Sequence, residues 1–425
     1  MRRTLAIAVL VGVNVTLALS SAAQEPSGLI KFPGMRLGGT VTRDAYGIPS
    51  VFGLSRWDLF FLQGYVHAED RFFQMDVGRR TAKGTLAELV GSAALPQDVQ
   101  LRTLGFGRAA DATYPRLADE TREALVAYAA GVNAYLASNS LPPEYKALEL
   151  TTAAQWQPTD TIAFAKLFAW NLSFDLDTTP TVTLLTYQAA GQILGVDGTK
   201  LFFEDLFRSA PFDPFTTIAP PAAKRPEGEA PAPLEDVTTE AEKESFYQQV
   251  SREADAMLKD GTLEALLAYQ DKIKDLPAFQ SVLRMEHEGS SNEWAIAGKL
   301  TTTGNPIVCN DPHLSLTTPA IWYPIALRGP GFNVSGNSVA GAPFVILGEN
   351  DHLAWGATVH PMDVTDTFKE TVVPDATSVV GYSIMYNGKK EPLSATPETF
   401  RRNVVGNGTN DDVVVVPASG SIPPA

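Results

Sequence analysis

The sequence is poor in the residues that crosslink proteins or hold catalytic metals. Its 425 residues include a single cysteine, Cys309, and five histidines. One cysteine cannot form an intrachain disulfide, so the fold must be stabilised by packing, with or without a bound ion. No H-E-x-x-H segment occurs, which excludes a zinc hydrolase of that design. No G-x-S-x-G segment occurs either, which leaves no nucleophile elbow for a serine esterase.

Positive charge is also scarce. The chain has 33 Lys and Arg against 48 Asp and Glu, a formal net charge of -15 and a pI of about 4.8. Such a chain repels phosphate backbones and anionic lipids, and we find no local basic patch. Nucleic acids and acidic membranes are therefore excluded as partners. Hydrophobic residues make up 44% and charged residues 19%, which is typical of a globular protein with a sizeable core.

The first residues predict export. A pair of arginines precedes an apolar stretch that ends at Ser21-Ala22-Ala23, small residues that suit a signal-peptidase site. We therefore interpret residues 1–23 as a signal peptide and expect a periplasmic or secreted protein. The alternative is an uncleaved membrane anchor, which Asn14 and the shortness of the stretch disfavour. After signal removal, no membrane contact is expected.

The pattern of apolar residues changes along the chain. Residues 38–53 predict two short strands around a turn. Apolar residues at helical spacing then predict helices at 56–91, at about 119–138, at 159–170 and over much of 241–284. Between the last two, residues 210–240 are rich in Pro, Ala and acids and indicate a surface linker. After residue 291, short β-prone runs alternate with Gly, Asn and Pro.

The change from helix to strand coincides with "EHEGSSNEWAIAGKL", residues 286–300. A serine hydroxyl is a weak nucleophile and needs a base beside it. If the peptide bond before a serine is cut, its own α-amine becomes free. That amine has a pKa of roughly 7.7–8.0, so it can act as the base near neutral pH. This stretch thus raises the hypothesis that a serine becomes a new N-terminus.

"GSSNEWAIAG" resembles the Gly-Ser-Asn-x-Trp-Ala sequence that opens the β subunit of the penicillin acylase family, N-terminal-nucleophile hydrolases that mature by self-cleavage. The match implies cleavage between Ser290 and Ser291, with Ser291 as the nucleophile, because Asn292 and Trp294 then take the family positions. The alternative register, with Ser290 as the nucleophile, misplaces both residues.

Other segments resemble the same family in the same order. "NDPHL" (310–314) is similar to its Asn-Asp-Pro-His segment, which implies that His313 orients the serine. The segment 331–368 resembles its glycine-rich strand pair. Upstream, "VTRDAYGIPSVFG", "LQGYVHAEDRFFQMDVGRRTAKGTLAELVG" and "AYAAGVNAYL" are similar to the α subunit. The resemblance runs from about residue 38 to 370, and several motifs in one order are more specific than any single one.

The resemblance also implies an oxyanion hole. Its first donor is the backbone N–H of Val359, in "GATVH", and its second is an asparagine that the family has beyond the position of Ala425. Family β subunits are longer than residues 291–425, so we expect a C-terminally truncated family member with an incomplete oxyanion hole. For self-cleavage, the Ser291 hydroxyl attacks the Ser290 carbonyl in a strained loop, without a catalytic part for His287 or Glu288.

A calcium site is a further implication of the resemblance. "MDVTDTF" (362–368) is similar to the family's calcium loop, with Asp363, Asp366 and the Thr365 carbonyl as ligands. The family glutamate that completes the site aligns with Thr179. Calcium therefore requires a substitute such as Asp175 or Asp177, and the alternative is a solvated acidic turn.

For the remaining charged candidates we favour structural roles. Arg71, Arg79, Arg80 and Glu88 are interpreted as an ion-pair network rather than as substrate contacts. His67 and His352 are interpreted as structural or surface residues.

Taken with the resemblance, the sequence predicts an α+β protein, an N-terminal-nucleophile hydrolase αββα sandwich that is incomplete at its C-terminal end. We expect an α-subunit-like helical part at 24–220, a spacer at 221–290 and the start of a β-subunit-like part at 291–425. The expected function is an exported acylase precursor that hydrolyses the amide of a small acylated substrate, of β-lactam or acyl-homoserine lactone type. The two parts would form a heterodimer after cleavage, without an organic cofactor. The alternative is a noncatalytic binding or scaffold remnant.

Overall fold

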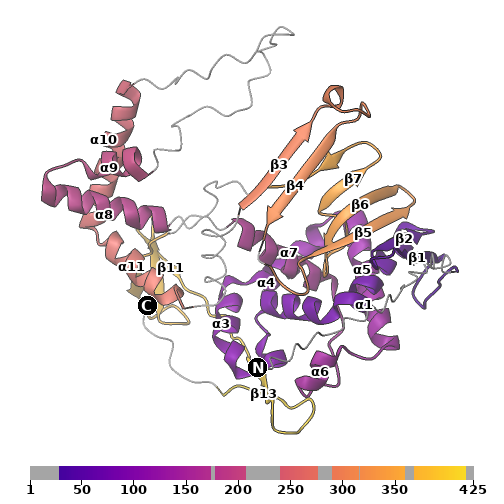
Figure 1. Ribbon diagram of the computed structural model, residues 1–425. Helices are drawn as coiled ribbons and strands as arrows, with labels where there is room; N and C mark the ends of the chain where they lie inside the picture. Colours follow the sequence, from indigo (N-terminus) through magenta and orange to yellow (C-terminus); the bar gives the residue numbers. More distant parts are fainter. Residues whose placement is uncertain are drawn as a thin grey trace, which may run out of the picture.

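The computed structural model describes residues 28–173, 178–206, 240–275, 290–314, 316–358 and 368–417. In these ranges a layer of helices covers one side of a six-stranded sheet, and a long hairpin rises beside that sheet (Figure 1). A second group of helices, drawn in magenta to salmon, lies to the left of the helical layer in the same view. Residues 221–239 and 276–289 of the predicted spacer lie outside the described ranges, whereas residues 240–275 are described and largely helical.

Helix α1 (Arg56–Lys83) is the longest element of the helical layer and has clear sequence signals at both ends. Ser55 caps its N-terminus by accepting a hydrogen bond from the N–H of Asp58 at 3.1 Å. Gly84 ends it in the left-handed conformation, which glycine adopts without steric cost. Within the helix, Arg71 has a non-helical backbone and introduces a kink. The helix predicted for residues 56–91 is thus confirmed, with a break at Gly84 before α2 (Ala87–Val90).

The six-stranded sheet combines strands from both halves of the sequence. Its order is β1-β2-β5-β6-β7-β8, and the pairing of β2 with β5 is parallel, with Ser50 opposite Ala326. The other neighbours are antiparallel. The strands are β1 (Gly39–Arg43), β2 (Pro49–Gly53), β5 (Trp322–Gly329), β6 (Phe332–Val339), β7 (Leu347–Asn350) and β8 (Ala354–Trp355). The sheet therefore ties the beginning of the chain to residues that follow the serine stretch.

Helices α1 and α5 (Asp119–Ser138) cross in close contact. A Cβ atom on Gly64 would lie 2.1 Å from the Tyr128 carbonyl oxygen, and one on Gly131 would lie 1.8 Å from the Phe61 carbonyl oxygen. Only glycine permits this approach at both positions. Side chains from α1 then pack on β2 and β5 in a core that contains Val51, Leu59, Phe61, Leu62, Val66, Tyr323, Ile325 and Leu327.

Shorter helices complete the layer, and a separate group follows. The layer also contains η1 (Ser92–Ala94), α3 (Leu95–Leu104), α4 (Phe106–Thr113), η2 (Tyr114–Arg116), α6 (Pro143–Ala147) and α7 (Pro158–Ser173). The second group packs on itself and comprises α8 (Thr178–Leu194), α9 (Gly198–Leu201), η3 (Phe202–Leu206), α10 (Glu240–Lys259) and α11 (Thr262–Ile273).

Two small sheets lie near the end of the chain. One has the order β11-β10-β9 and the other pairs β12 with β13. The β12–β13 hairpin is fixed to the helical layer, because the Glu149 carboxylate accepts hydrogen bonds from the N–H groups of Gly406, Asn407 and Gly408 at 2.8, 3.2 and 3.0 Å. The strands are β9 (Val372–Pro374), β10 (Tyr382–Tyr386), β11 (Lys389–Pro392), β12 (Arg401–Asn403) and β13 (Val413–Val415).

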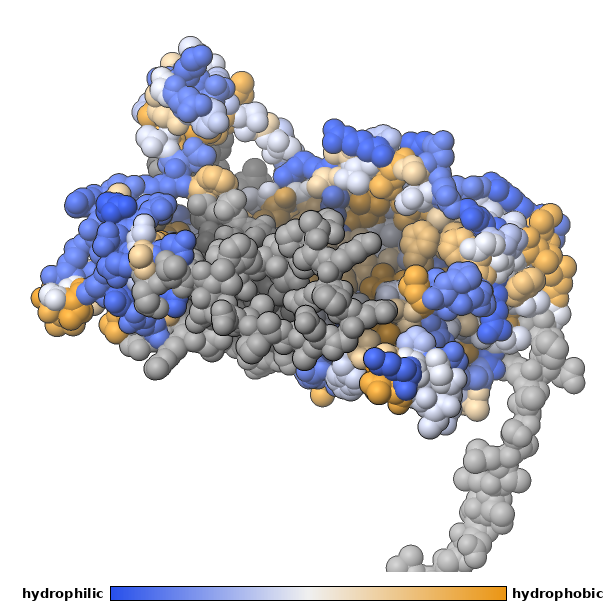
Figure 2. All heavy atoms as spheres, turned by 90° about the horizontal axis from the view of Figure 1, so that it is seen from above, coloured by the Kyte–Doolittle hydropathy of each residue, from blue (hydrophilic) through white to orange (hydrophobic). Residues whose placement is uncertain are grey.

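The predicted α+β class is confirmed, because a helical layer and largely antiparallel sheets occupy different parts of the fold. On the face seen in Figure 2, apolar side chains reach the surface in scattered groups among hydrophilic ones. None of the helices in the described ranges has the length and hydropathy that a membrane span requires.

Candidate functional site

The serine stretch forms one strand of a long hairpin. Strand β3 (Ser290–Ile296) pairs with β4 (Ile307–His313) over its full length, with Ser290 opposite His313 and Ser291 opposite Pro312. A short 3-10 helix, η4 (Gly298–Leu300), follows β3. The motif predicted to carry the nucleophile and the motif predicted to carry His313 are therefore adjacent strands.

The bond between Ser290 and Ser291 lies in a regular strand. We expected a strained loop there, and this expectation is wrong for these two residues. The β-prone residues Trp294 and Ile296 pair with Cys309 and Ile307 further along the hairpin, and the same register continues to the start of the motif. Opposite Ser291, Pro312 has no N–H to contribute to that ladder.

Strand geometry separates the side chains of Ser291 and His313. Directly opposed residues of an antiparallel pair share a face, and successive residues alternate between faces. Ser291 therefore shares its face with Pro312, Glu293 and Asn310, whereas His313 lies on the face of Asn292. The structure brings the two predicted residues to the same end of the hairpin but does not bring their side chains together.

On its own face, the His313 ring lies close to the side chains of Asp311 and Asn292. Its Nε2 lies 3.1 Å from Asp311 Oδ2 and 3.4 Å from Asn292 Nδ2. With a proton on Nε2 the ring donates to Asp311, and without one it accepts from the Asn292 amide. Asn292, which the family motif singles out, thus lies against the histidine of the second motif.

The face of Ser291 is approached by the backbone that follows β8. The Asn310 side chain hydrogen-bonds both the carbonyl oxygen and the N–H of Ala357, each at 3.1 Å. Ser291 itself is half-buried on this side of the hairpin. One carboxylate, that of Glu293, lies on the same face of the hairpin as Ser291.

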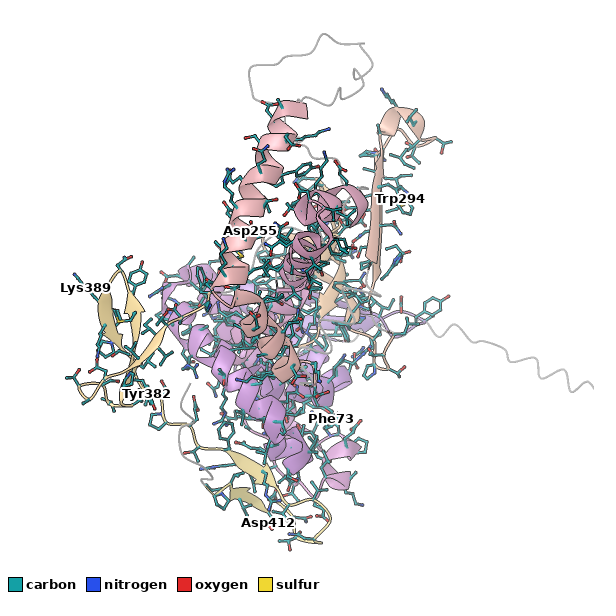
Figure 3. The ribbon with its side chains drawn as sticks, turned by 90° about the vertical axis from the view of Figure 1, so that its left-hand side faces the viewer. Phe73, Asp255, Trp294, Tyr382, Lys389 and Asp412 are labelled. Atoms are coloured by element: carbon teal, nitrogen blue, oxygen red, sulfur yellow. The ribbon has the colours of Figure 1, made fainter. Side chains whose placement is uncertain are left out.

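The hairpin is otherwise exposed. Figure 3 shows Trp294 on a strand that extends away from the rest of the molecule. Its side chain is 52% exposed, and Leu300 and Ile307 are also exposed. Within the described residues, β3 and β4 form a two-stranded sheet of their own.

Several predicted site residues lie outside the described residues. They are the oxyanion donor Val359, the calcium ligands Asp363, Thr365 and Asp366, and the substitutes Asp175 and Asp177. Thr179, which the resemblance aligns with the family glutamate, lies in the first turn of α8, where its carbonyl accepts from the Thr183 hydroxyl at 2.8 Å. In the described ranges no group of three or more His, Cys, Asp or Glu side chains is arranged to hold a metal ion.

The predicted ion-pair network is confirmed for Arg79, Arg80 and Glu88, but not for Arg71. Arg79 donates to Asp76 at 2.6 Å and to Asp160 at 3.1 Å, and Arg80 bonds Asp76 and Glu88. Asp76 is fully buried, and burial raises its pKa, but the charges of Arg79 and Arg80 outweigh that effect and lower it. Arg71 is not part of this network and instead donates to the Ala320 carbonyl at 3.1 Å.

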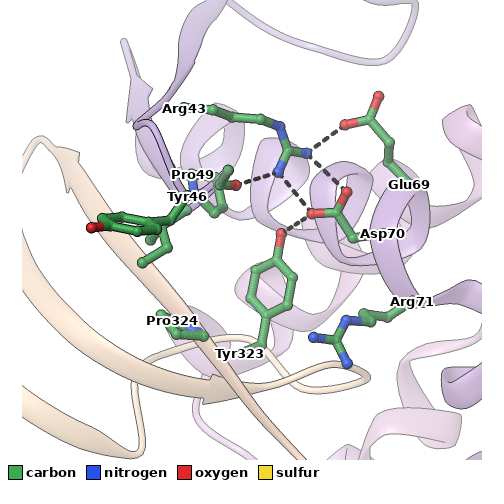
Figure 4. A pocket seen from close by; sticks show the side chains of 10 residues that line it. Arg43, Tyr46, Pro49, Glu69, Asp70, Arg71, Tyr323 and Pro324 are labelled. Carbon is green, nitrogen blue, oxygen red and sulfur yellow. Dashed lines mark hydrogen bonds and ion pairs between the residues drawn. The ribbon is translucent and has the colours of Figure 1, made fainter. Parts of the chain in front are cut away.

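A cavity of about 500 Å³ lies at the seam between β2, α1 and β5 (Figure 4). Arg43 forms its polar wall, bonding Glu69 at 2.7 Å and Asp70 at 2.8 Å, and the Tyr323 hydroxyl also donates to Asp70. Burial lowers the pKa of Arg43, but these carboxylates outweigh it and raise the pKa above its usual range. None of the residues lining this cavity belongs to the β3–β4 hairpin. In its lining, Arg43 is paired with Glu69 and Asp70, whereas Arg71 hydrogen-bonds the Ala320 carbonyl.

His67 is fully buried and hydrogen-bonds two buried hydroxyl groups, which the sequence did not predict. Its Nδ1 lies 2.8 Å from the Tyr128 hydroxyl and its Nε2 lies 3.0 Å from the Ser338 hydroxyl. Because Ser338 donates to the Tyr323 carbonyl, His67 donates through Nε2 and accepts through Nδ1. The structural role predicted for His67 is confirmed, and the only signal in the sequence was its place within an apolar helical stretch.

Comparisons with known proteins support the family resemblance. A family model described as "Penicillin amidase" matches residues 39–416. An acyl-homoserine lactone acylase, QuiP, from Pseudomonas aeruginosa is 28% identical over 88% of this chain and 39% of its own length. Penicillin acylase 2 proenzyme from Pseudomonas sp. is 29% identical over 89% of this chain and 42% of its own length.

Two further relatives are penicillin G acylases. The Escherichia coli protein is 28% identical over 94% of this chain and 46% of its own length. A solved structure of the thermostable enzyme from Alcaligenes faecalis aligns with a TM-score of 0.37 at 30% identity, over 42% of this chain and 96% of that one. The chain thus spans less than half the length of the curated relatives named here.

Proposed function

The chain belongs to the penicillin amidase family, and from that premise we propose that it is the precursor of an exported acylase whose nucleophile is Ser291. The observation that carries the proposal is the pairing of "SSNEWAI" with "IVCNDPH", two family motifs, as the adjacent strands β3 and β4. Family membership is supported by the match over residues 39–416. Export is proposed from the sequence of residues 1–23 alone.

The first step is self-cleavage. The Ser291 hydroxyl oxygen attacks the carbonyl carbon of Ser290, the Ser290–Ser291 amide bond breaks, and the nitrogen leaves as the α-amine of Ser291. Water then hydrolyses the ester that links the two residues, which frees the Ser290 carboxylate and the Ser291 hydroxyl. Before this step the nitrogen is an amide and cannot act as a base, so processing creates the base.

The second chemistry is acyl transfer. The Ser291 hydroxyl attacks the carbonyl of a small acyl amide while the free α-amine takes its proton through a water molecule. The substrate's amine leaves with that proton, and water hydrolyses the acyl ester. Backbone N–H groups must stabilise the oxyanion, and we propose Val359 as one of them from the sequence alone.

The substrate class follows from the named relatives, which act on penicillins and on acyl-homoserine lactones. We propose a small amide with an apolar acyl group. Calcium at Asp363, Thr365 and Asp366 is likewise proposed from the sequence, and no step above depends on it. A lower Tm in the presence of EGTA would support the ion, and an unchanged Tm would count against it.

The decisive experiment is intact-mass analysis of the purified chain over time. We expect two fragments that meet between Ser290 and Ser291, and a full-length chain for Ser291→Ala. Ser290→Ala is the matched control and should still be cleaved. A wild-type chain that stays intact, and that releases no acid from penicillin G or an N-acyl-homoserine lactone, would instead favour a noncatalytic binding or scaffold protein.

A further inference from the structure

Asn310 uses its side-chain amide completely. It lies in β4, half-buried, on the face of the hairpin that carries Ser291. Its Nδ2 donates to the Asn292 carbonyl oxygen and to the Ala357 carbonyl oxygen, each at 3.1 Å, and its Oδ1 accepts from the Ala357 N–H at 3.1 Å. Both donors and the acceptor are therefore engaged with backbone groups of two different segments.

The second segment lies directly on this face of the hairpin. A Cβ atom on Gly356 would lie 2.7 Å from Asn310 Cβ and 2.8 Å from Glu293 Oε1. No side chain fits at position 356, because these atoms leave no room for one. Gly356 thus permits the segment after β8 to lie close to the hairpin, and the Asn310 side chain fixes that segment through the backbone of Ala357.

The contact joins the strand of the nucleophile to a segment far along the chain. Asn310 and Ala357 are 47 positions apart. The other carbonyl to which Asn310 donates belongs to Asn292, the residue that follows Ser291. A change at Asn310 therefore alters two things together: the strand immediately after the nucleophile and the backbone that walls its face.

Asparagine is the side chain that this geometry requires. An aspartate has the same size but only accepts hydrogen bonds when ionised, and it would face the two carbonyl oxygens with negative charge. Serine offers a single donor, and alanine offers none. Substitutions at position 310 can therefore test whether the amide group itself, and not only a side chain of that size, is required.

We propose that Asn310 is a positioning residue, whose amide fixes the start of β3 against the Gly356–Ala357 backbone so that the Ser291 hydroxyl is held in its reactive orientation. This role rests on the function proposed above. It is a role in geometry, because Asn310 acts through the backbones of Asn292 and Ala357 rather than on the reacting atoms. Displacements of about 1 Å at a reacting centre can slow a reaction roughly a hundredfold.

The kinetic arm of the test compares self-cleavage in the full 425-residue chain. We expect Asn310→Ala and Asn310→Asp to slow the appearance of the Ser291 N-terminus at least about tenfold. Asn333→Ala is the matched control, because Asn333 is an exposed asparagine on β6 whose amide bonds Asp351. Its cleavage rate should match that of the wild type. A slowing as large for Asn333→Ala as for Asn310→Ala would overturn the proposal.

A pH profile distinguishes positioning from a loss of stability. The aspartate in Asn310→Asp recovers one donor when it is protonated, so cleavage of this variant should recover relative to wild type as the pH falls below 5. Asn310→Ala has no such group and should show no recovery. Equal profiles for the two variants would contradict a hydrogen-bonding role.

Hydrogen exchange tests the contact separately from the reaction. In the Ser291→Ala chain, which cannot cleave, Asn310→Ala should speed exchange of the Ala357 N–H, because its acceptor is lost. Unchanged exchange would overturn the contact. Faster exchange with a normal cleavage rate would overturn the positioning role. An intact wild-type chain would refute the proposed function and the positioning role with it, while exchange alone would still decide whether Asn310 holds Ala357.

Discussion

At the scale of single residues, His67 is a fully buried histidine whose pKa is strongly lowered. Burial is the main cause, the charge of Arg71 adds to it, and together they lower the pKa of His67 to about 3. The ring is neutral in the folded protein and accepts from Tyr128 while donating to Ser338. A proton on Nδ1 would break the first of these contacts.

This histidine should make stability depend on pH. In the unfolded chain its pKa is near 6.5, so below that pH the unfolded state takes up a proton that the folded state refuses until about pH 3. The stability that the neutral His67 ring contributes is fully present above pH 6.5 and is lost as the pH falls from about 6.5 to about 3. Between pH 7 and pH 5 we expect the free energy of unfolding to fall by roughly 2 kcal/mol from this group.

Urea denaturation at the two pH values measures the effect. His67→Gln should flatten the pH dependence, although it also lowers stability because two buried hydroxyls change partners. His352→Gln is the control, since His352 lies on an exposed turn, and it should keep the wild-type slope. Identical slopes for the two variants would contradict the buried neutral ring.

Only those site residues that lie in short contiguous motifs could be predicted from the sequence. The motifs around Ser291 and His313 were recognisable because each is a short contiguous segment, and the structure places them on paired strands. Their faces could not be predicted, because a shift of one position in the register moves every side chain to the other side. The contact between Asn310 and Ala357 was equally inaccessible, since it depends on how β8 returns to the hairpin.

At the scale of elements, α1 is held to its neighbours by buried charge. Asp76 accepts from Arg79, Arg80 and the Tyr145 hydroxyl of α6, while Arg79 reaches Asp160 of α7. Removing Asp76 takes one carboxylate from each of the two buried arginines and leaves only Asp160 beside Arg79 and Glu88 beside Arg80. The network thus couples the position of α1 to two other helices.

Asp76→Ala should lower the free energy of unfolding by about 3–5 kcal/mol. Asp119→Ala, which removes the partner of Arg122 from an exposed pair at the start of α5, should change it little. Denaturant titration of both variants gives the comparison. Similar small losses in the two variants would mean that Asp160 and Glu88 alone neutralise the buried arginines.

The helices were predicted where apolar spacing was long and uninterrupted. The predictions at 119–138 and 159–170 correspond to α5 and α7. The helical run after residue 241 is divided into α10 and α11 at Gly261, which adopts a left-handed conformation. Helix α8 was missed, because its run of threonines with Pro180 is typical of strands and turns when tertiary packing is not known.

At the scale of the whole molecule, the six-stranded sheet crosses the predicted cleavage point. Strands β1 and β2 precede Ser291, whereas β5 to β8 follow it, and β2 and β5 pair in parallel. The core over them mixes Val51, Leu59 and Phe61 with Ile325 and Leu327. Cutting one bond in β3 removes none of these contacts.

The two fragments should therefore remain associated after cleavage. We expect them to elute together in size-exclusion chromatography under native conditions and to separate in denaturant. A variant with Leu327→Asp, which places a charge in the shared core, is the comparison and should release them or prevent folding. Fragments of the wild type that separate without denaturant would refute a shared sheet.

The shared sheet was beyond sequence reasoning. The strand pattern at 38–53 was recognisable, but its partner was not, because parallel pairing joins segments that are distant in the chain and leaves no local signature. We expected a helical part followed by a sheet-forming part. The structure instead takes the first two strands of the sheet from the helical part.

The hydrogen bond from His67 to Ser338 spans 271 positions. A nascent chain leaving the ribosome cannot close it, or the sheet around it, until nearly all of these residues have been synthesised. The high contact order that results makes assembly slow compared with local helix formation. We therefore expect the proposed self-cleavage to follow, and not to precede, the pairing of β2 with β5.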